Sequence, residues 1–158
     1  MEHQVYEFIF NHYIQDAVTP ILIARSSDAT ILSRFTLEEI LERLHPGSVT
    51  DPAMLSELID TQHRSISLDW RPIMVNASYL DTSKLPRDGR GFWEHFHRQH
   101  PEHSGYYVVS EVVLKGNEAV VVIGYRCAAL CGAHDAVFHV SKNGKSWRIE
   151  AGVRLWVS

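Results

Sequence analysis

Four apolar stretches, separated by turn-forming residues, occupy the last third of the chain. Asn143-Gly144 stands between the last two, and this pair is typical of a tight hairpin, whose turn needs positive φ at its central residues. Within 119–126 both alternating sets of side chains are apolar, so we expect both faces of this sheet to be covered. The pattern predicts strands over 106–114, 119–126, 136–141 and 147–157.

Apolar residues at helical spacing are frequent in the first two-thirds of the chain. Val5 and Ile9 lie one turn apart and belong to an amphipathic N-terminal pattern. Thr36 and Glu39 form a capping-box pattern, in which each side chain accepts the other residue's backbone N–H. Pro52 is typical of a first helical position. We expect helices over about 2–17, 37–44, 52–62 and 91–100, strands over 21–24 and 73–80, and a loop over 84–91.

Helices followed by a run of strands are typical of the α+β class. At 158 residues the chain is expected to form a single α+β domain over 1–158. The N-terminal and central helices should pack mainly on one face of a C-terminal four-stranded antiparallel sheet. Such an architecture is similar in shape to cystatin-like or nuclear-transport-factor-like folds, although a fold does not fix a function.

Composition and charge argue against several functions. The net charge is -4 with both signs interspersed, so we expect no nucleic-acid binding. The longest apolar run, at 119–123, is too short for a membrane span. Nucleophile-elbow, phosphate-loop and dinucleotide-binding motifs are absent, so no catalytic residues and no cofactor are expected. The first four residues lack the pattern of a signal peptide, which leaves a cytoplasmic location open.

Cys127 and Cys131 fall in the connection between two expected strands. There they could approach to the distance of a disulfide, which is the pairing we expect. Together with His134 and His139 they also form a set of four zinc-type ligands, at the edge of the usual structural spacing. Inert thiols, a zinc site and redox-active thiols therefore remain open as alternatives.

Histidines are concentrated between residues 95 and 103. His97 and His100 fall on the same helical face as Trp93 and Phe96, at spacings of three, four and seven residues. This placement favours packed rings over metal ligation, and no metal site is assigned here. Two ligands from His97 and His100 stay a weaker alternative.

Aromatic residues gather near the ends of the expected strands. Most of them should belong to the core, because a sheet covered on both faces needs apolar mass on each side. The functional alternative is a concave sheet face that holds a protein partner or a small apolar ligand. The candidate binding residues are Trp70, Tyr107, Tyr125, Phe138 and Trp156.

The C-terminal half resembles a family of uncharacterised bacterial proteins, many of which carry secretion or lipoprotein signals. The resemblance is clearest over residues 92–158. It implies a periplasmic or envelope origin, and it implies no particular activity. It also implies aromatic packing at His97 and His100, where family members usually carry tyrosine. The shared pattern is Trp93-x-x-Phe96, Pro101, Gly105, Ser110-x-Val112, Ala119–Val122, Cys127-x-x-Leu130-Cys131-Gly132, Gly144-x-x-Trp147 and the closing Trp156-Val-Ser158.

Taken together, the sequence favours a non-enzymatic binding or interaction protein. It would bind a partner protein in the manner of bacterial immunity proteins, and homo-oligomerisation is open. The alternatives are a thiol- or zinc-dependent enzyme built on Cys127, Cys131, His134 and His139, and a carrier of a small apolar ligand.

Overall fold

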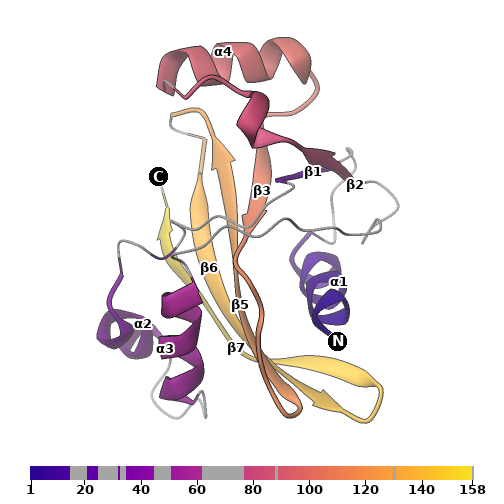
Figure 1. The fold of residues 1–158 in the computed structure, drawn as a ribbon, viewed down its shortest axis with the longest axis vertical. Coiled ribbons are helices and arrows are strands. Elements are labelled where there is room, and N and C mark those ends of the chain that lie inside the picture. Colours follow the sequence, from indigo (N-terminus) through magenta and orange to yellow (C-terminus); the bar gives the residue numbers. More distant parts are fainter. Residues whose placement is uncertain are drawn as a thin grey trace.

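A computed structural model describes residues 1–14, 21–24, 32, 35–44, 51–61, 77–87, 89–129 and 131–157 (Figure 1). These residues form an α+β fold in which helices accompany a single mixed sheet. The helices are α1 (Glu2–Tyr13), α2 (Leu37–Arg43), α3 (Pro52–Thr61) and α4 (Gly89–Gln99), with a short 3-10 helix η1 (Thr82–Lys84). The strands are β1 (Ile21–Ala24), β2 (Ala77–Leu80), β3 (Gly105–Val109), β4 (Val113–Lys115), β5 (Glu118–Cys127), β6 (His134–Asn143) and β7 (Ser146–Val157).

The sheet is larger than the sequence predicts. Its order is β2-β1-β3-β5-β6-β7, with β4 paired to β5 outside this path. Four C-terminal strands, β3, β5, β6 and β7, pair antiparallel as expected, but β1 extends them by pairing parallel to both β3 and β2. The expectation of a four-stranded antiparallel sheet is therefore wrong in extent. Every residue of β1 is buried, which agrees with the continuous apolar run in its sequence.

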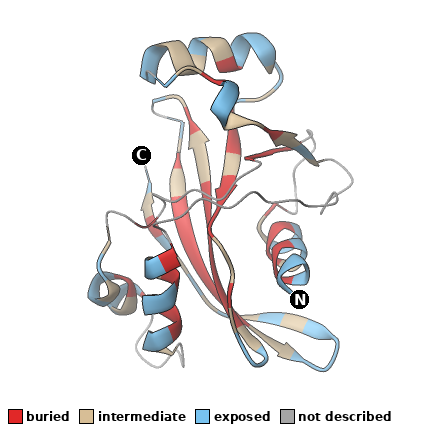
Figure 2. Ribbon diagram, viewed as in Figure 1, coloured by how far each residue is buried: buried red, intermediate tan, exposed pale blue. Residues whose placement is uncertain are grey.

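Helices cover both faces of the described sheet: α2, α3 and α4 pack on one face, which agrees with the expectation of helices mainly on one face, and α1 packs on the other. Alternate residues of β5 point into two separate apolar clusters, as a strand with period two requires. Val121 and Ile123 pack with α1, whereas Val120 and Val122 pack with residues of α2, α3 and α4. Figure 1 shows α1 on one side of the long strands and α2 with α3 on the other, and Figure 2 shows the buried residues along β5 and β6 between them.

Local signals at the helix starts are confirmed. Glu39 N–H donates to Thr36 Oγ1 at 3.2 Å and Thr36 N–H donates to Glu39 Oε2 at 2.7 Å, which completes the capping box of α2. Pro52 is the first residue of α3, preceded by Asp51, whose carboxylate accepts the Ala53 N–H at 2.8 Å. Helix α4 begins at Gly89, so the predicted loop over 84–91 is too long at its end.

Two strand boundaries differ from the prediction for reasons visible in the register. The expected strand over 106–114 divides into β3 and β4. Val109 pairs with Ile123 and Val113 pairs with Val120, so the segment between β3 and β4 has one residue more than the facing part of β5. The last hairpin turns one residue later than expected, at Gly144-Lys145, and Gly144 takes φ 63 there. The ladder between β6 and β7 also shifts register between Asp135 and Ala136, and again between His139 and Val140.

Parts of three predicted elements lie outside the described residues. They are residues 15–17 of the N-terminal helix, residue 62 of the third helix and residues 73–76 of the second short strand. Among the residues described here, no helix is long and apolar enough to cross a membrane.

Candidate functional site

Three tyrosines and a histidine lie in one line across the sheet. Tyr79 of β2 and Tyr107 of β3 both pair with Ile23 of β1, Tyr107 pairs with Tyr125 of β5, and Tyr125 pairs with His134 of β6. Directly paired residues point to the same face of a sheet. Each of the four side chains is half-buried. We call Tyr79, Tyr107, Tyr125 and His134 the tyrosine row.

The end of α1 packs onto this row. The rings of Tyr107 and Tyr125 lie 4.9 Å apart between centroids, and those of Tyr125 and His134 lie 6.2 Å apart. Tyr13, the last residue of α1, has its ring 5.8 Å from His134 and 5.5 Å from Phe138. Such tilted and edge-on ring contacts are favourable beyond the area they bury. The backbone of the row is thus fixed by strand pairing, and its side chains contact the end of α1.

Hydrogen bonds indicate which tautomer the neutral ring of His134 adopts. His134 Nδ1 lies 2.8 Å from the carbonyl oxygen of Gly132, which can only accept, so Nδ1 carries the proton. In the neutral ring Nε2 is then an acceptor, and the hydroxyl of Tyr13 donates to it. The imidazole therefore links α1 to the loop between β5 and β6.

The phenols of Tyr107 and Tyr13 are kept neutral by a raised pKa. Burial raises the pKa of Tyr107 to about 12, and the nearby Tyr125 and Tyr13 act in the same direction. Burial also raises the pKa of Tyr13, against an opposing effect of the Arg154 guanidinium. A general base must be deprotonated near the working pH, and these groups are not. The row supplies hydroxyl donors and acceptors together with ring faces.

The raised pKa of Tyr107 makes stability depend on pH in the alkaline range. The phenol is held neutral in the folded protein, so its contribution is complete below the ordinary pKa of 10.0 and is lost as pH rises toward about 12. We expect the free energy of unfolding to fall by about 1–2 kcal/mol more between pH ~9 and ~11.5 in the wild type than in Tyr107→Phe. Urea unfolding followed by circular dichroism measures the difference. Equal falls in the two proteins would contradict the prediction.

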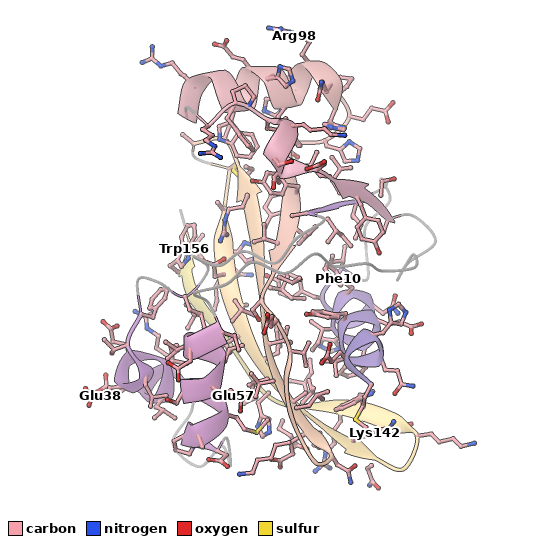
Figure 3. All side chains as sticks on the ribbon, in the orientation of Figure 1. Phe10, Glu38, Glu57, Arg98, Lys142 and Trp156 are labelled. Atoms are coloured by element: carbon pink, nitrogen blue, oxygen red, sulfur yellow. A yellow bond between two sulfur atoms is a disulfide. The ribbon has the colours of Figure 1, made fainter. Side chains whose placement is uncertain are left out.

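On the opposite face an ion pair ties β5, β6 and β7 together. Asp135 is 2% exposed, and its Oδ1 lies 2.6 Å from Nη1 of Arg126. Trp156 Nε1–H donates to the other carboxylate oxygen, and the Arg126 guanidinium lies over the Trp156 ring, 5.7 Å from its centroid. Gly124 leaves the room for this arrangement, because a Cβ there would meet Asp135 Oδ1 at 2.2 Å. Figure 3 shows Trp156 across the sheet from Phe10 of α1.

The cysteines form a disulfide, as expected. Cys127 and Cys131 are joined with their Cα atoms 6.1 Å apart. The four residues of the alternative zinc site do not converge, because His134 lies on the α1 face whereas His139 pairs with Val120 on the other face. His139 is 1% exposed, and its Nε2 lies 3.9 Å from a carboxylate oxygen of Glu118. In the described part of the chain no three His, Cys, Asp or Glu side chains are placed to hold a metal ion.

His97, exposed on α4, and His100, which follows the helix directly, have their rings beside aromatic rings. The ring of Trp93 lies 5.9 Å from that of His97, and the ring of Phe96 lies 5.3 Å from that of His100. Phe96 is fully buried. Burial, and then the neighbouring His103, lower the pKa of His100. The prediction that these residues share one aromatic face is confirmed.

Of the five predicted binding residues, three come together. Tyr107, Tyr125 and Phe138 lie on the α1 face, whereas Trp156 lies on the other and holds the ion pair. Trp70 lies outside the described residues. Sequence reasoning missed Tyr79 and Tyr13, and it assigned His134 only to the alternative metal site. The pairing through β1 is the signal that places Tyr79, and it is not visible in the sequence.

Comparison with known proteins identifies no relative of this chain. No protein-family model matches the chain, and no curated protein or solved structure matches it.

Proposed function

We propose that the protein is a non-enzymatic interaction protein that binds a partner protein through the tyrosine row. The observation that carries this proposal is the register of β2, β1, β3, β5 and β6, which aligns three half-buried tyrosines and a histidine on one face. Tyrosine is enriched at protein interfaces because its ring supplies contact area and its hydroxyl supplies a hydrogen bond.

The size and rigidity of the row suit a protein surface. Neighbouring strands lie about 4.8 Å apart, so four strand intervals from Tyr79 to His134 span roughly 19 Å. That length fits within a standard interface of about 800 Å² per partner. Because the strands fix the backbone and the rings contact one another, little side-chain entropy is lost on binding. The net charge of -4 favours a partner with a basic surface, as in immunity-like neutralisation.

A small apolar ligand is the second candidate for the same row. Tyr13, Phe138 and the row together offer ring faces with a few polar groups, which is the usual lining of small-molecule sites. The enzyme alternative is weaker, because both cysteines are joined in a disulfide and the two histidines lie on opposite faces.

Two finer expectations belong to the same proposal. An extracytoplasmic location agrees with the Cys127–Cys131 disulfide, since disulfides persist mainly in oxidising compartments. The likeness to cystatin-like or nuclear-transport-factor-like folds is supported by the antiparallel part of the sheet with α1 on one face. The parallel strands β1 and β2 are additions to that arrangement.

Site-specific photo-crosslinking tests the proposal. A benzophenone amino acid in place of Tyr79 is expected to form an adduct with one protein in an extract of the source cells. The same label in place of Glu57, which is exposed on α3 beneath the opposite face, should give none of that adduct. Adding excess unlabelled wild type should abolish the adduct, and excess Tyr125→Ala should do so at least about tenfold less well.

Equal adducts from positions 79 and 57, or equal competition by the two unlabelled proteins, would overturn the proposal. An adduct-free result with a bound small molecule in native mass spectrometry would instead assign the row to a ligand carrier.

A further inference from the structure

The two halves of the disulfide differ in their accessibility. Cys127 is 8% exposed at the end of β5, where it pairs with Gly105 of β3. The contact is close, since a Cβ on Gly105 would lie 2.8 Å from the Cys127 Cβ. Cys131, in the loop that follows, is exposed. A thiolate arriving from solvent therefore reaches the Cys131 sulfur and is shielded from that of Cys127.

Opening the disulfide does not require the sheet to open. Directly beside the loop, Tyr125 pairs with His134, and the Arg126–Asp135 ion pair joins the same two strands. Within the loop, Gly132 adopts φ 85, and its carbonyl is held by His134. These contacts fix both ends of the loop without the sulfur bond, so the bond closes a loop that is already anchored.

We propose that Cys131 is a thiol-exchange site that accepts a small thiol of the glutathione class as a mixed disulfide. The thiolate of the small molecule attacks Cys131 Sγ and forms a new sulfur–sulfur bond. The Cys127–Cys131 bond breaks, its electron pair leaves on Cys127 Sγ, and this sulfur takes a proton from solvent. A second thiolate then attacks the small-molecule sulfur, releases Cys131 as a thiolate and leaves the small molecule as its own disulfide.

The exchange acts on the end of the tyrosine row. Gly132, whose carbonyl orients the imidazole of His134, follows Cys131 directly. A group attached to Cys131 is thus three residues from His134. It lies on the same loop as the Gly132 carbonyl, which sets the tautomer of the His134 ring. The site itself does not depend on the proposed partner binding.

Intact mass and peptide mapping test the inference without any partner. Folded wild type, incubated briefly with reduced glutathione and quenched with acid before a second thiol can react, is expected to carry one glutathione. Fragmentation of the peptide that contains both cysteines should place it on Cys131. In a second measurement, glutathione disulfide should modify the single thiol of Cys127→Ser at least about tenfold faster than that of Cys131→Ser. Circular dichroism before and after the reaction reports whether the fold is retained.

Three results would overturn the inference: an adduct mapped to Cys127, equal rates in the two variants, or an adduct that forms only in denaturant. The wild-type mapping remains decisive if either serine variant fails to fold. Because neither measurement involves the partner, failure here leaves the proposed function intact, and failure of the crosslinking leaves this site intact.

Discussion

Replacing Asp135 by alanine is expected to lower the free energy of unfolding by about 3–5 kcal/mol. The carboxylate is 2% exposed and accepts from Arg126 on one oxygen and from Trp156 on the other. Its loss leaves the guanidinium and the indole N–H in a partly buried site without this acceptor, which costs their desolvation. The removed pair also joins β5, β6 and β7, so three strands lose a common anchor.

The measurement is urea unfolding of purified variants, followed by circular dichroism. Glu150→Ala is the matched control, since it removes a carboxylate that pairs with Arg148 on the surface of β7, and it should change stability little. Asp135→Asn keeps one acceptor for Trp156 and should fall between the wild type and Asp135→Ala. A loss in Asp135→Ala no larger than in Glu150→Ala would show that the pair contributes nothing to the fold.

A methyl group added at Gly124 is expected to cost about 3 kcal/mol or more. The new Cβ would lie 2.2 Å from Asp135 Oδ1, 2.7 Å from Arg126 Nη1 and 2.8 Å from Val108 Cγ2. No single rotation clears all three, because both partners of the ion pair are held by each other. Gly124→Ala should therefore displace the pair as well as crowd the core.

Gly89→Ala supplies the matched control for this substitution. Nothing lies within 4 Å of a Cβ at Gly89, which is the first residue of α4, so alanine there should be neutral or slightly stabilising. In the Asp135→Ala background, Gly124→Ala should cost less than in the wild type, because one of the three clashes is gone. Unfolding of the four variants in urea gives both comparisons. An unchanged cost in that background would place the clash elsewhere.

Local signals were predictable from the sequence, and long-range pairing was not. The capping box at Thr36, the start of α3 at Pro52 and the coverage of both faces of β5 all follow from residues close together in the chain. The position of β1 does not, because its two parallel neighbours in the sheet, β2 and β3, both come much later in the chain. Parallel strands are not joined by a hairpin turn, so no local sequence signal indicates their pairing.

The candidate site shows the same division. Tyr107, Tyr125 and Phe138 could be named because they are aromatic residues within continuous apolar strands. Their alignment with Tyr79 depends on the register of the two parallel pairs β1–β2 and β1–β3. A shift of one residue in either register would move a side chain to the other face of the sheet. The role of Trp156 was also out of reach, because only the fold brings it to Asp135.

The register shifts between β6 and β7 bear on whether the protein aggregates at high concentration. In the described sheet path β7 is an edge strand, as β2 is at the other end, and an unpaired edge is a template for aggregation. The two shifts divide the ladder so that its longest regular segments, over 136–139 and 140–143, contain four pairs each. Bulges twist an edge away from regular pairing, and Arg148, Glu150 and Arg154 place charges along it. An extended segment of another chain thus finds little regular backbone to pair with, and we expect β7, the longest described strand, to resist fibril growth.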